Sequence, residues 1–239
     1  MVDLTVVTFN PAWGLPTTGP FALKLLKWLD LAGVPYRQRF EERAEKGPKG
    51  KNPWIELEGE RIGDTESIIA LLAKRHGFDI DAGLPAGLLA RNHAIRRMVE
   101  EHFHQVLEWE LFVHPAGRVY VREAVDRLGI PSLVGGLVAA SVCGHFERQL
   151  KARGIGRHSP ELIAQKGIAD LDALADLLAD TPFFGGNHPA MADIAVYGLL
   201  APMAKWPMRT PVAEELKRRP KLMGFVERMI GATAGPVGS

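Results

Sequence analysis

The chain has 239 residues, of which 46% are hydrophobic and 24% are charged, and its formal net charge is +1. A chain of this length has enough apolar mass for one large domain or two smaller ones. The near-neutral charge, without blocks of like charge, gives no electrostatic reason to expect a nucleic acid as partner. We therefore expect a globular protein that does not bind nucleic acid.

Cysteine is nearly absent from the sequence. Cys143 is the single one, so no disulfide can form within the chain, which is typical of a reducing compartment. It lies in the apolar run SLVGGLVAASVCG, which predicts a small core residue, with a reactive nucleophile as the alternative. The N-terminal residues do not resemble a secretory signal, and no uncharged run reaches the ~20 residues of a membrane span. We expect a cytoplasmic protein without a membrane span.

The first part of the chain alternates between strand and helix patterns. LTVVTF is rich in β-branched residues and predicts a short buried strand. Apolar residues at helical spacing predict a helix over residues 21–32, with Lys24 and Lys27 on the opposite, polar side. YRQRF predicts a second strand. Because one helix separates the two strands, we expect them to pair in parallel.

A hairpin and a second helix follow. WIELEG and ERIGD have the alternation of an antiparallel hairpin, and TESIIALLAKRHG has the pattern of a helix. Gly33 and Gly77 stand where the two helices of this region should end. The order βαβ and then ββα predicts a small α/β domain of thioredoxin-like layout.

The rest of the chain predicts helices and no convincing strand. The fold class we expect is an α/β thioredoxin-like N-terminal domain plus an all-α C-terminal domain. The expected helices cover residues 90–113, 118–128, 131–153, 161–178 and 190–200, with a short last one in PKLMGFVERMIG. The expected boundaries are a domain over 1–77, a linker over 78–87, a helical domain over 88–231 and a disordered tail over 232–239.

Pro53 stands directly before the strand-like run WIELEG. Proline has no amide hydrogen and suits the start of an edge strand. An X–Pro bond adopts the cis form at a cost of only ~0.5–1 kcal/mol relative to trans. A cis bond would turn the carbonyl and amide around Asn52 and Trp54 outward, where they could pair with an extended peptide. A trans turn is the alternative, and the residues alone leave both open.

Glu66 and Ser67 stand at the start of the second helix, after Asp64 and Thr65. Helix N-termini present unpaired amides and a partial positive charge. The residues alone favour a cap formed by Asp64 or Thr65, with Glu66 complementing the helix dipole. In the alternative, Ser67 and the amides bind a carboxylate of a ligand, and Glu66 binds an ammonium group of the same ligand.

Several motifs in combination resemble the glutathione transferase-like superfamily. Within it they are most similar to the branch that includes failed-axon-connections and metaxin-like proteins. The motifs that carry the resemblance are GPFALKLLKWLDLAGVPY, KNPWIELEGERIGDTESI, GIGRHSPELI and FFGGNHPAMADIAVYGLL.

This resemblance implies an enzyme that binds glutathione and transfers it to a small apolar electrophile, and that forms a homodimer. It implies a cis bond at Pro53, with Asn52 and Trp54 beside the cysteinyl part of glutathione. Glu66 and Ser67 match the pair that binds the γ-glutamyl end. The alternative is a non-catalytic glutathione-binding or protein-assembly module of metaxin-like type.

The residue that would activate the thiol of glutathione departs from the family pattern. Much of the superfamily has Ser or Cys where this chain has Gly19, and enzymes of the tyrosine type place their residue near Phe9 and Asn10. Thr18 is therefore the first catalytic candidate, with Thr17 and Asn10 as alternatives, because thiolate chemistry needs a nearby donor. Gly19 favours the non-catalytic alternative.

Trp13 is a candidate for the wall of the co-substrate pocket, and the alternative is that it covers the domain interface. The loop between the first predicted strand and the first predicted helix, residues 10–19, contains no Cys, which excludes a thiol oxidoreductase of the thioredoxin type.

The motif HPAMAD departs from the family in a second way. The superfamily commonly has a Ser/Thr-x-x-Asp capping box there, but Ala190 stands in place of the hydroxyl residue while Asp193 is present. Loss of such a cap costs roughly 1 kcal/mol, so we expect the helix to recover this elsewhere.

We expect no metal cofactor. Glu101 and His104 have a spacing that occurs in carboxylate-bridged metal sites, but such sites need a second copy of the pattern, and the sequence has none.

Overall fold

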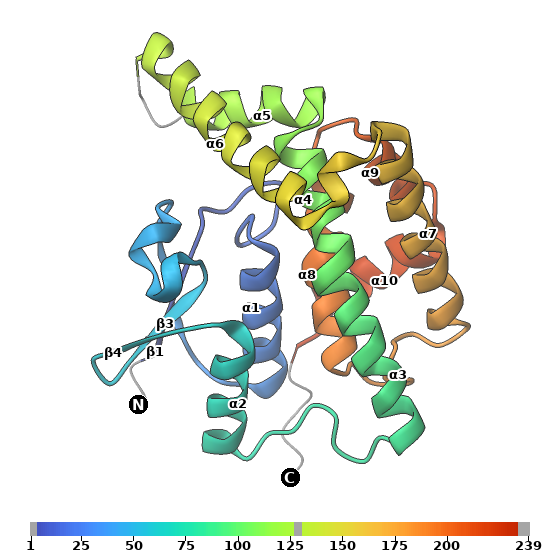
Figure 1. Ribbon diagram of the computed structural model, residues 1–239. Helices are drawn as coiled ribbons and strands as arrows, with labels where there is room; N and C mark the ends of the chain where they lie inside the picture. The colour runs from blue at the N-terminus through green and yellow to red at the C-terminus, as the bar shows by residue number, and fades with distance from the viewer. Residues whose placement is uncertain (1–3, 127–130, 234–239) are drawn as a thin grey trace. The chain divides into compact units, whose positions relative to one another are not determined.

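The computed structural model describes residues 4–126 and 131–233, and Figure 1 shows its ribbon. Contacts divide the chain into two compact units. The first consists of the chain up to Arg96, of Leu178–Lys205 and of the chain from Gly224 on. The second consists of Arg97–Leu177 and Trp206–Met223.

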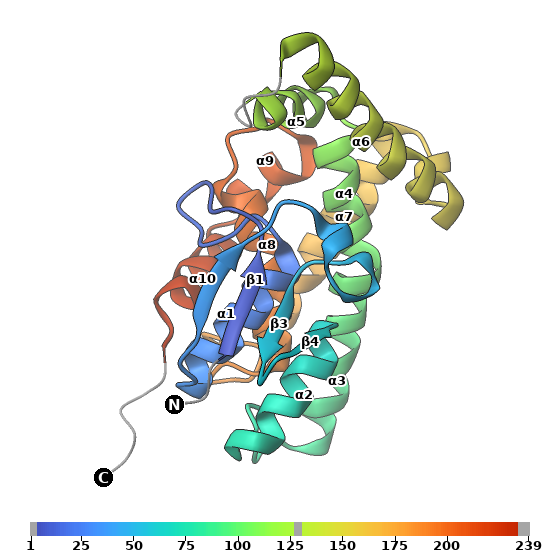
Figure 2. The ribbon, with the colours of Figure 1, turned by 90° about the vertical axis from the view of Figure 1, so that its left-hand side faces the viewer.

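A mixed four-stranded sheet is the centre of the first unit. Its strands are β1 (Leu4–Thr8), β2 (Arg37–Phe40), β3 (Trp54–Leu57) and β4 (Glu60–Gly63), in the order β2-β1-β3-β4. Strand β1 pairs in parallel with β2 and antiparallel with β3, and β3 and β4 form a hairpin (Figure 2). The predicted pairing and the thioredoxin-like layout are confirmed.

Helices α1 (Pro20–Ala32) and α2 (Thr65–His76) belong to the same unit. Both end at glycines in the left-handed conformation, Gly33 with φ 62° and Gly77 with φ 66°. Only glycine adopts this conformation without a steric cost, so the predicted helix ends are confirmed. The segment between β2 and β3 contains two short 3₁₀ helices, Ala44–Lys46 and Pro48–Gly50.

Helix α8 (Met191–Lys205) lies beside α1 in Figures 1 and 2. A Cβ atom at Gly198 of α8 would lie 2.5 Å from the carbonyl oxygen of Pro20, so the absence of a side chain permits this close approach. The prediction that Lys24 and Lys27 lie on a polar, solvent-facing side of α1 is wrong. Their exposed fractions are 0% and 5%, because α8 covers that side of the helix.

The N-terminus of α8 obtains its caps from Asp193 and from a distant residue. The carboxylate of Asp193 accepts hydrogen bonds from the backbone amides of Phe184, Gly185 and Ala190, at 2.7, 3.0 and 2.8 Å. Asp81, in the irregular segment before α3, accepts one from the amide of Met191 at 2.8 Å. The helix therefore recovers the cap that Ala190 cannot supply.

We expect Asp81→Ala to lower the free energy of unfolding by about 1 kcal/mol, because it leaves one helix-terminal amide without its acceptor. Urea denaturation measures this change. Asp79→Ala, in the same segment, is a suitable control, because the Asp79 side chain accepts only from the local amide of Asp81 among the described bonds. Equal stability of the Asp81 variant and the unmodified protein would contradict this role of Asp81.

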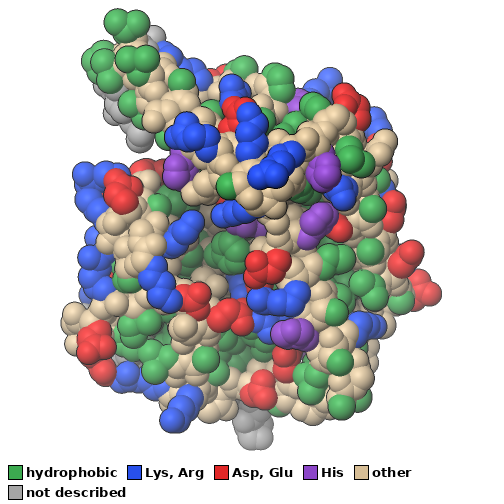
Figure 3. Space-filling model, viewed as in Figure 1, with side chains coloured by type: hydrophobic (Ala, Val, Ile, Leu, Met, Phe, Trp, Pro, Cys, Tyr) green, Lys and Arg blue, Asp and Glu red, His purple; other side chains and the backbone are tan. Residues whose placement is uncertain are grey.

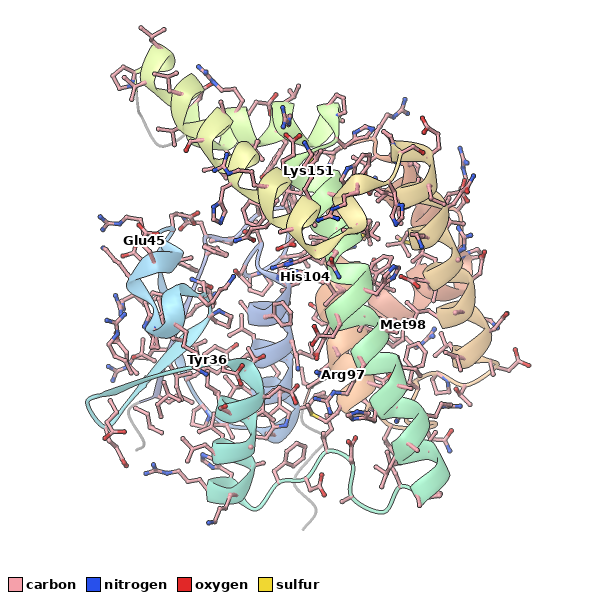
Figure 4. The ribbon with its side chains drawn as sticks, in the orientation of Figure 1. Tyr36, Glu45, Arg97, Met98, His104 and Lys151 are labelled. Atoms are coloured by element: carbon pink, nitrogen blue, oxygen red, sulfur yellow. The ribbon has the colours of Figure 1, made fainter. Side chains whose placement is uncertain are left out.

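The remaining helices confirm the all-α character of the C-terminal part. They are α3 (Ala86–Arg97), α4 (His104–Phe112), α5 (Pro115–Asp126), α6 (Ser132–Arg153), α7 (Pro160–Leu178), α9 (Pro211–Lys217) and α10 (Pro220–Gly231). Between α3 and α4, Met98–Phe103 form a π-helical segment. Figure 4 labels Met98, the first residue of this segment, and Arg97, which precedes it.

Most predicted helix ranges agree with these helices to within a few residues, and the one over 118–128 begins at Pro115. The predicted helix over 90–113 begins four residues earlier, at Ala86, and the one over 190–200 continues to Lys205. The predicted end at Leu128 lies outside the described residues, as does the predicted tail from residue 234 on. The seven-residue helix α9 escaped prediction altogether.

Helix α9 begins at a buried carboxylate supplied by α4, within the second unit. Glu110 accepts hydrogen bonds from the Thr210 hydroxyl at 2.5 Å and from the amides of Val212 and Ala213 at 2.7 and 3.2 Å. The exposed fraction of Glu110 is 0%. A side chain 100 residues distant in sequence thus caps this helix, which explains why local patterns do not reveal it.

Cys143 has an exposed fraction of 3% and packs with Val121, Val125 and Ala139, as predicted for a core residue. In the part of the chain that the structure describes, no helix is both long and apolar enough to cross a membrane.

Candidate functional site

Three candidate segments meet at one edge of the sheet. Trp54 at the start of β3 pairs with Val7 near the end of β1 and with Gly63 at the end of β4. The loop after β1, the residues before β3 and the start of α2 therefore lie at the same edge. The sequence names these segments as candidates, and the sheet register brings them together.

The Asn52–Pro53 peptide bond is cis. The residues alone left cis and trans open, and the resemblance implied cis. Pro53 and Trp54 are buried, and the Asn52 side-chain amide donates to the carbonyl oxygen of Glu41 at 3.3 Å. This bond fixes the segment before β3 against the segment after β2.

Asp64 is the N-cap of α2. Its carboxylate accepts from the backbone amide and the hydroxyl of Ser67, at 2.9 and 3.0 Å. The hydrogen bond from the Ser67 backbone amide lowers the pKa of Asp64. The cap that the residues alone favoured is therefore present, and it involves both of the groups with which Ser67 could bind a ligand.

The backbone of Asp64 is strained, with φ 76° and ψ 113°. A residue with a side chain rarely adopts this conformation, which costs of order 1–3 kcal/mol, and such residues cluster at functional sites. No sequence pattern indicates a positive φ at an aspartate, so sequence analysis had assigned Asp64 only a capping role. Because of this strain, we include Asp64 in the candidate site.

Glu66 is held by two cations. Lys24 of α1 donates to its Oε1 atom at 2.5 Å, and Arg96 of α3 donates to both of its carboxylate oxygens. Partial burial would raise the pKa of Glu66, but the hydrogen bonds from Arg96 and Lys24 outweigh it and lower the pKa to about 2. The carboxylate is therefore ionised at neutral pH.

The two cations differ from ordinary surface partners in their burial. The side chains of Lys24 and Arg96 are 1% and 14% exposed, whereas that of Glu66 is 46% exposed. The group of Lys24, Arg96 and Glu66 has a formal charge of +1 and lies at the first turn of α2, where the helix dipole is also positive. Sequence patterns did not reveal either cation, because Lys24 and Arg96 belong to other helices and no local spacing connects them with Glu66.

The loop between β1 and α1 holds the candidates for thiol activation. Thr17 is fully buried, and its hydroxyl accepts from the amide of Gly19 at 3.3 Å. Thr18 is partly exposed. Asn10 is exposed at its side chain, while its backbone amide donates to Glu42 at 2.7 Å. Of the three candidates, Thr17 is thus the one whose side-chain hydroxyl already accepts a hydrogen bond within the loop.

The N-terminus of α1 carries no side-chain cap, because its N-cap residue is Gly19 and Pro20 follows. Helix N-termini stabilise thiolates. A Cβ atom at Gly19 would lie 3.1 Å from a ring carbon of Phe9, so a serine or cysteine there would require a small displacement of that ring.

Trp13 lies in a tight turn of the same loop. It has φ 55° and the following Gly14 has φ 75°, and the amide of Leu15 donates to Ala12 at 2.8 Å. A positive φ at a bulky residue is a rare conformation. Adjacent to this turn is a hollow of about 130 Å³, lined by Gly14, Leu15, Pro16, Leu23, Leu26, Lys27, Asp30, Tyr197 and Ile230.

Among the described residues, no group of three His, Cys, Asp or Glu side chains is arranged to hold a metal ion.

Comparison with protein families finds two matching models. One described as glutathione S-transferase N-terminal domain matches residues 20–117, and one described as glutathione S-transferase C-terminal domain matches residues 167–229.

Three relatives align with most of the chain. Isoprene-epoxide glutathione S-transferase of Rhodococcus sp. (strain AD45) is 29% identical over 95% of this chain and 97% of its own length. Failed axon connections of Drosophila melanogaster is 30% identical over 90% of this chain, which spans 54% of that protein. A metaxin-1 homologue of Caenorhabditis briggsae is 28% identical over 90% of this chain and 69% of its own length.

The fold of this chain is also similar to the folds of solved structures. The β-etherase LigF from Sphingobium sp. strain SYK-6 superposes with a TM-score of 0.64 at 17% identity, over 96% of both chains. The chain therefore belongs to the glutathione S-transferase-like superfamily, and its relatives include the failed axon connections and metaxin-like branch.

Proposed function

We propose that this protein binds glutathione and transfers it to a small apolar electrophile. The observation that carries the proposal is the convergence of three segments at one sheet edge: the loop after β1, the Asn52–Pro53 segment before β3 and the first turn of α2. The relationship to a glutathione S-transferase whose name specifies an isoprene epoxide supports the electrophile class. We keep the cytoplasmic location and the homodimer as predictions of the same proposal.

The cysteinyl part of glutathione would pair with the backbone of Asn52 and Trp54. Its γ-glutamyl end would lie at the first turn of α2, with its carboxylate near Ser67 and the helix amides. Glu66 contributes by holding Arg96 and Lys24 beside this carboxylate, because its own charge is already compensated by both cations. Asp64, which is exposed and strained, is the better acceptor for the γ-glutamyl ammonium.

The thiolate would lie near the uncapped N-terminus of α1, within reach of the Thr18 hydroxyl. Both stabilise negative charge on sulfur, so the thiol loses its proton to water more readily. The sulfur then attacks the electrophilic carbon. A C–S bond forms, and the electron pair of the broken bond moves to the leaving atom. Trp13 would offer an apolar surface to the co-substrate.

A non-catalytic glutathione-binding or assembly module is the second candidate. Two observations favour it: Gly19 provides no side chain at the position where much of the superfamily has Ser or Cys, and a metaxin-1 homologue is among the relatives.

We expect glutathione to raise the thermal unfolding midpoint of the protein. A ligand at 100 times its dissociation constant adds about 2.7 kcal/mol of stability, which a thermal-shift titration detects easily. Asp64→Asn should weaken binding about tenfold, because it removes a charged contact of about 1.4 kcal/mol or more. Ser67→Ala should also weaken binding, because the Ser67 hydroxyl donates to the Asp64 carboxylate and orients it. Glu60→Gln, at an exposed position of β4, is the control and should bind normally.

Turnover separates the two candidate functions. Thr18→Val should preserve glutathione binding but reduce the conjugation rate by about tenfold or more, as loss of an oxyanion-hole donor does. An unchanged rate would transfer the role to Asn10, Thr17 or a backbone amide. Binding without conjugation of any epoxide or halide would support the non-catalytic module. The absence of both a thermal shift and retention on immobilised glutathione would refute the enzyme and the glutathione-binding module alike.

A further inference from the structure

A hollow of about 460 Å³ lies against the sheet of the first unit. Its wall contains Arg39, Glu41, Lys46, Trp54, Glu56 and Arg61. Four of these residues come from the sheet: Arg39 and Trp54 both pair with Val7, and Glu56 pairs with Arg61. Directly opposite residues share a face of a sheet, as do residues two apart along a strand, so the four side chains lie on one face. The volume is that of a small-molecule site, which is typically ~300–1,000 Å³.

The segment between β2 and β3 supplies the rest of the wall, with Glu41 and Lys46. It packs closely on Trp54, since a Cβ atom at Gly47 would lie 2.7 Å from a carbon of the indole ring. Lys49 in the same segment has φ 60°, a conformation that residues with side chains rarely adopt and that clusters at functional sites. Trp54 is 1% exposed, and its Nε1 atom has no hydrogen-bond acceptor among the described residues. Buried donors normally have an acceptor, so this part of the wall is incomplete by itself.

Glu56 holds two arginines at the hollow. Arg39 donates to its Oε1 atom, and the Nε atom of Arg61 lies 3.8 Å from the same oxygen. The guanidinium of Arg61 also lies over the ring of Trp54, 5.1 Å from its centroid, and donates to the backbone carbonyl of Lys46. The two arginines therefore approach one carboxylate from different strands, and this group has an excess of one positive charge.

Glu41 holds a second pair of cations. Its carboxylate pairs with Lys46 at 2.6 Å and with Arg43 at 3.2 Å. Together the two groups contain four cations and two carboxylates, so their formal charge is +2. Figure 3 shows Lys and Arg side chains along the edge of the molecule that carries this segment, where Figure 4 labels Glu45. Pairing among these groups alone leaves the excess of positive charge uncompensated.

We propose that this hollow binds the phosphate monoester of a small molecule. A phosphate monoester carries a charge of about −1.5 to −2 at pH 7, which complements the charge of the two groups. The planar fork of an arginine matches phosphate oxygens bidentately. Among the described bonds, Arg39 donates only through Nη2, so its remaining N–H groups are available to a ligand. The hollow is larger than a phosphate group requires, which leaves room for the organic part.

Nuclear magnetic resonance of the indole N–H groups tests the site. The chain has five tryptophans, and Trp54→Phe identifies the signal of Trp54 by its loss. Glycerol 3-phosphate should shift this signal in a saturable manner, and inorganic phosphate should do so at higher concentrations, since it lacks the organic part. Sodium chloride at equal ionic strength should leave the signal in place. The proposal is overturned if glycerol 3-phosphate causes no saturable shift, or if sodium chloride causes an equal one.

Calorimetric titration of variants with glycerol 3-phosphate tests the role of the arginines. Arg39→Gln should weaken binding about tenfold, the usual effect of losing a charge-assisted contact. Arg61→Lys retains the charge but loses the planar fork and its contact with the ring, so it should weaken binding to a similar extent. The two arginine side chains are 49% and 48% exposed, so both variants should retain the native unfolding midpoint.

Arg75 provides the matched controls. It lies on α2 and pairs with Glu58, outside the hollow. Arg75→Gln and Arg75→Lys should therefore bind glycerol 3-phosphate like the native protein. Equal weakening by the variants at Arg39, Arg61 and Arg75 would show a general attraction of anions to the surface and would overturn the site.

Saturating glutathione distinguishes this hollow from the proposed glutathione site. The proposed contacts with glutathione use the backbone of Trp54, whereas the hollow uses its side chain, so the inference does not rest on the proposed function. Glycerol 3-phosphate should bind with the same affinity in the presence and absence of glutathione. Competition between the two ligands would place them in one site and overturn the proposal. If glutathione does not bind at all, the titration with glycerol 3-phosphate alone still decides whether the hollow is a site.

Discussion

Asp193→Ala should lower the free energy of unfolding by about 3–5 kcal/mol. The Asp193 carboxylate accepts from three backbone amides, those of Phe184, Gly185 and Ala190, and its exposed fraction is 0%. Each buried amide that loses its acceptor costs about 1–3 kcal/mol. Because α8 packs along α1, loss of its N-terminal anchor also weakens the packing on which the loop before α1 depends.

Urea denaturation of purified variants measures this effect. Asp193→Asn retains the shape but turns an amide group toward backbone donors, so it should be nearly as destabilising as alanine. Asp176→Ala, at an exposed position of α7, should change the stability by less than about 0.5 kcal/mol. A loss of under about 1 kcal/mol in Asp193→Ala would show that water or a rearranged loop replaces the carboxylate.

Stability should fall as the pH rises from about 5 to about 8, and Glu110 should account for most of this change. Burial raises the pKa of Glu110 to about 7 from its ordinary value of 4.5, although bonds from Thr210, Val212 and Ala213 oppose the shift. The folded protein therefore retains a proton that the unfolded chain has already lost. This contribution is complete below pH 4.5 and disappears as the pH rises through 7.

The size of the effect follows from the same two pKa values. A difference of about 2.5 units corresponds to roughly 3 kcal/mol. Asp193 acts in the same direction at lower pH, since burial raises its pKa from 3.8 to about 6. Glu110→Gln imitates the protonated acid and should flatten the pH dependence between 5 and 8.

Urea midpoints at several pH values, compared between the native protein and Glu110→Gln, check this expectation. The difference between the two curves isolates Glu110 from His114, whose pKa burial lowers and which acts in the opposite direction. Glu101→Gln, 71% exposed at its side chain in the adjoining π-helical segment, is the control and should retain the full pH dependence. Parallel curves for the native protein and Glu110→Gln would assign the dependence to other groups.

Local signals were sufficient for the elements of the first unit. The alternation of WIELEG and ERIGD gave the hairpin, and Gly33 and Gly77 marked helix ends that no residue with a side chain would adopt as readily. The cis bond at Pro53 followed from the resemblance, because the residues alone allowed either isomer. For the hairpin and the two helix ends, the physical cause lies within a few residues of the feature.

Sequence patterns did not reveal the features that depend on residues distant along the chain. Lys24 has the appearance of a solvent-facing lysine, because the periodicity of α1 cannot reveal that α8 covers that side. Helix α9 has only seven residues, too few to be stable alone, and Glu110 from another helix caps it. The cap that Asp81 provides for α8 is separated from that helix by 110 positions.

The candidate site shows the same division. Short motifs and the order of elements were enough for the superfamily resemblance and for the candidate segments. The contacts between the side chains of these segments required the folded chain. Lys24 and Arg96 converge on Glu66 from separate helices, and the sheet register brings Asp64 and Pro53 to one edge. Charge pairing and register act through space, so they arise only when the chain has folded.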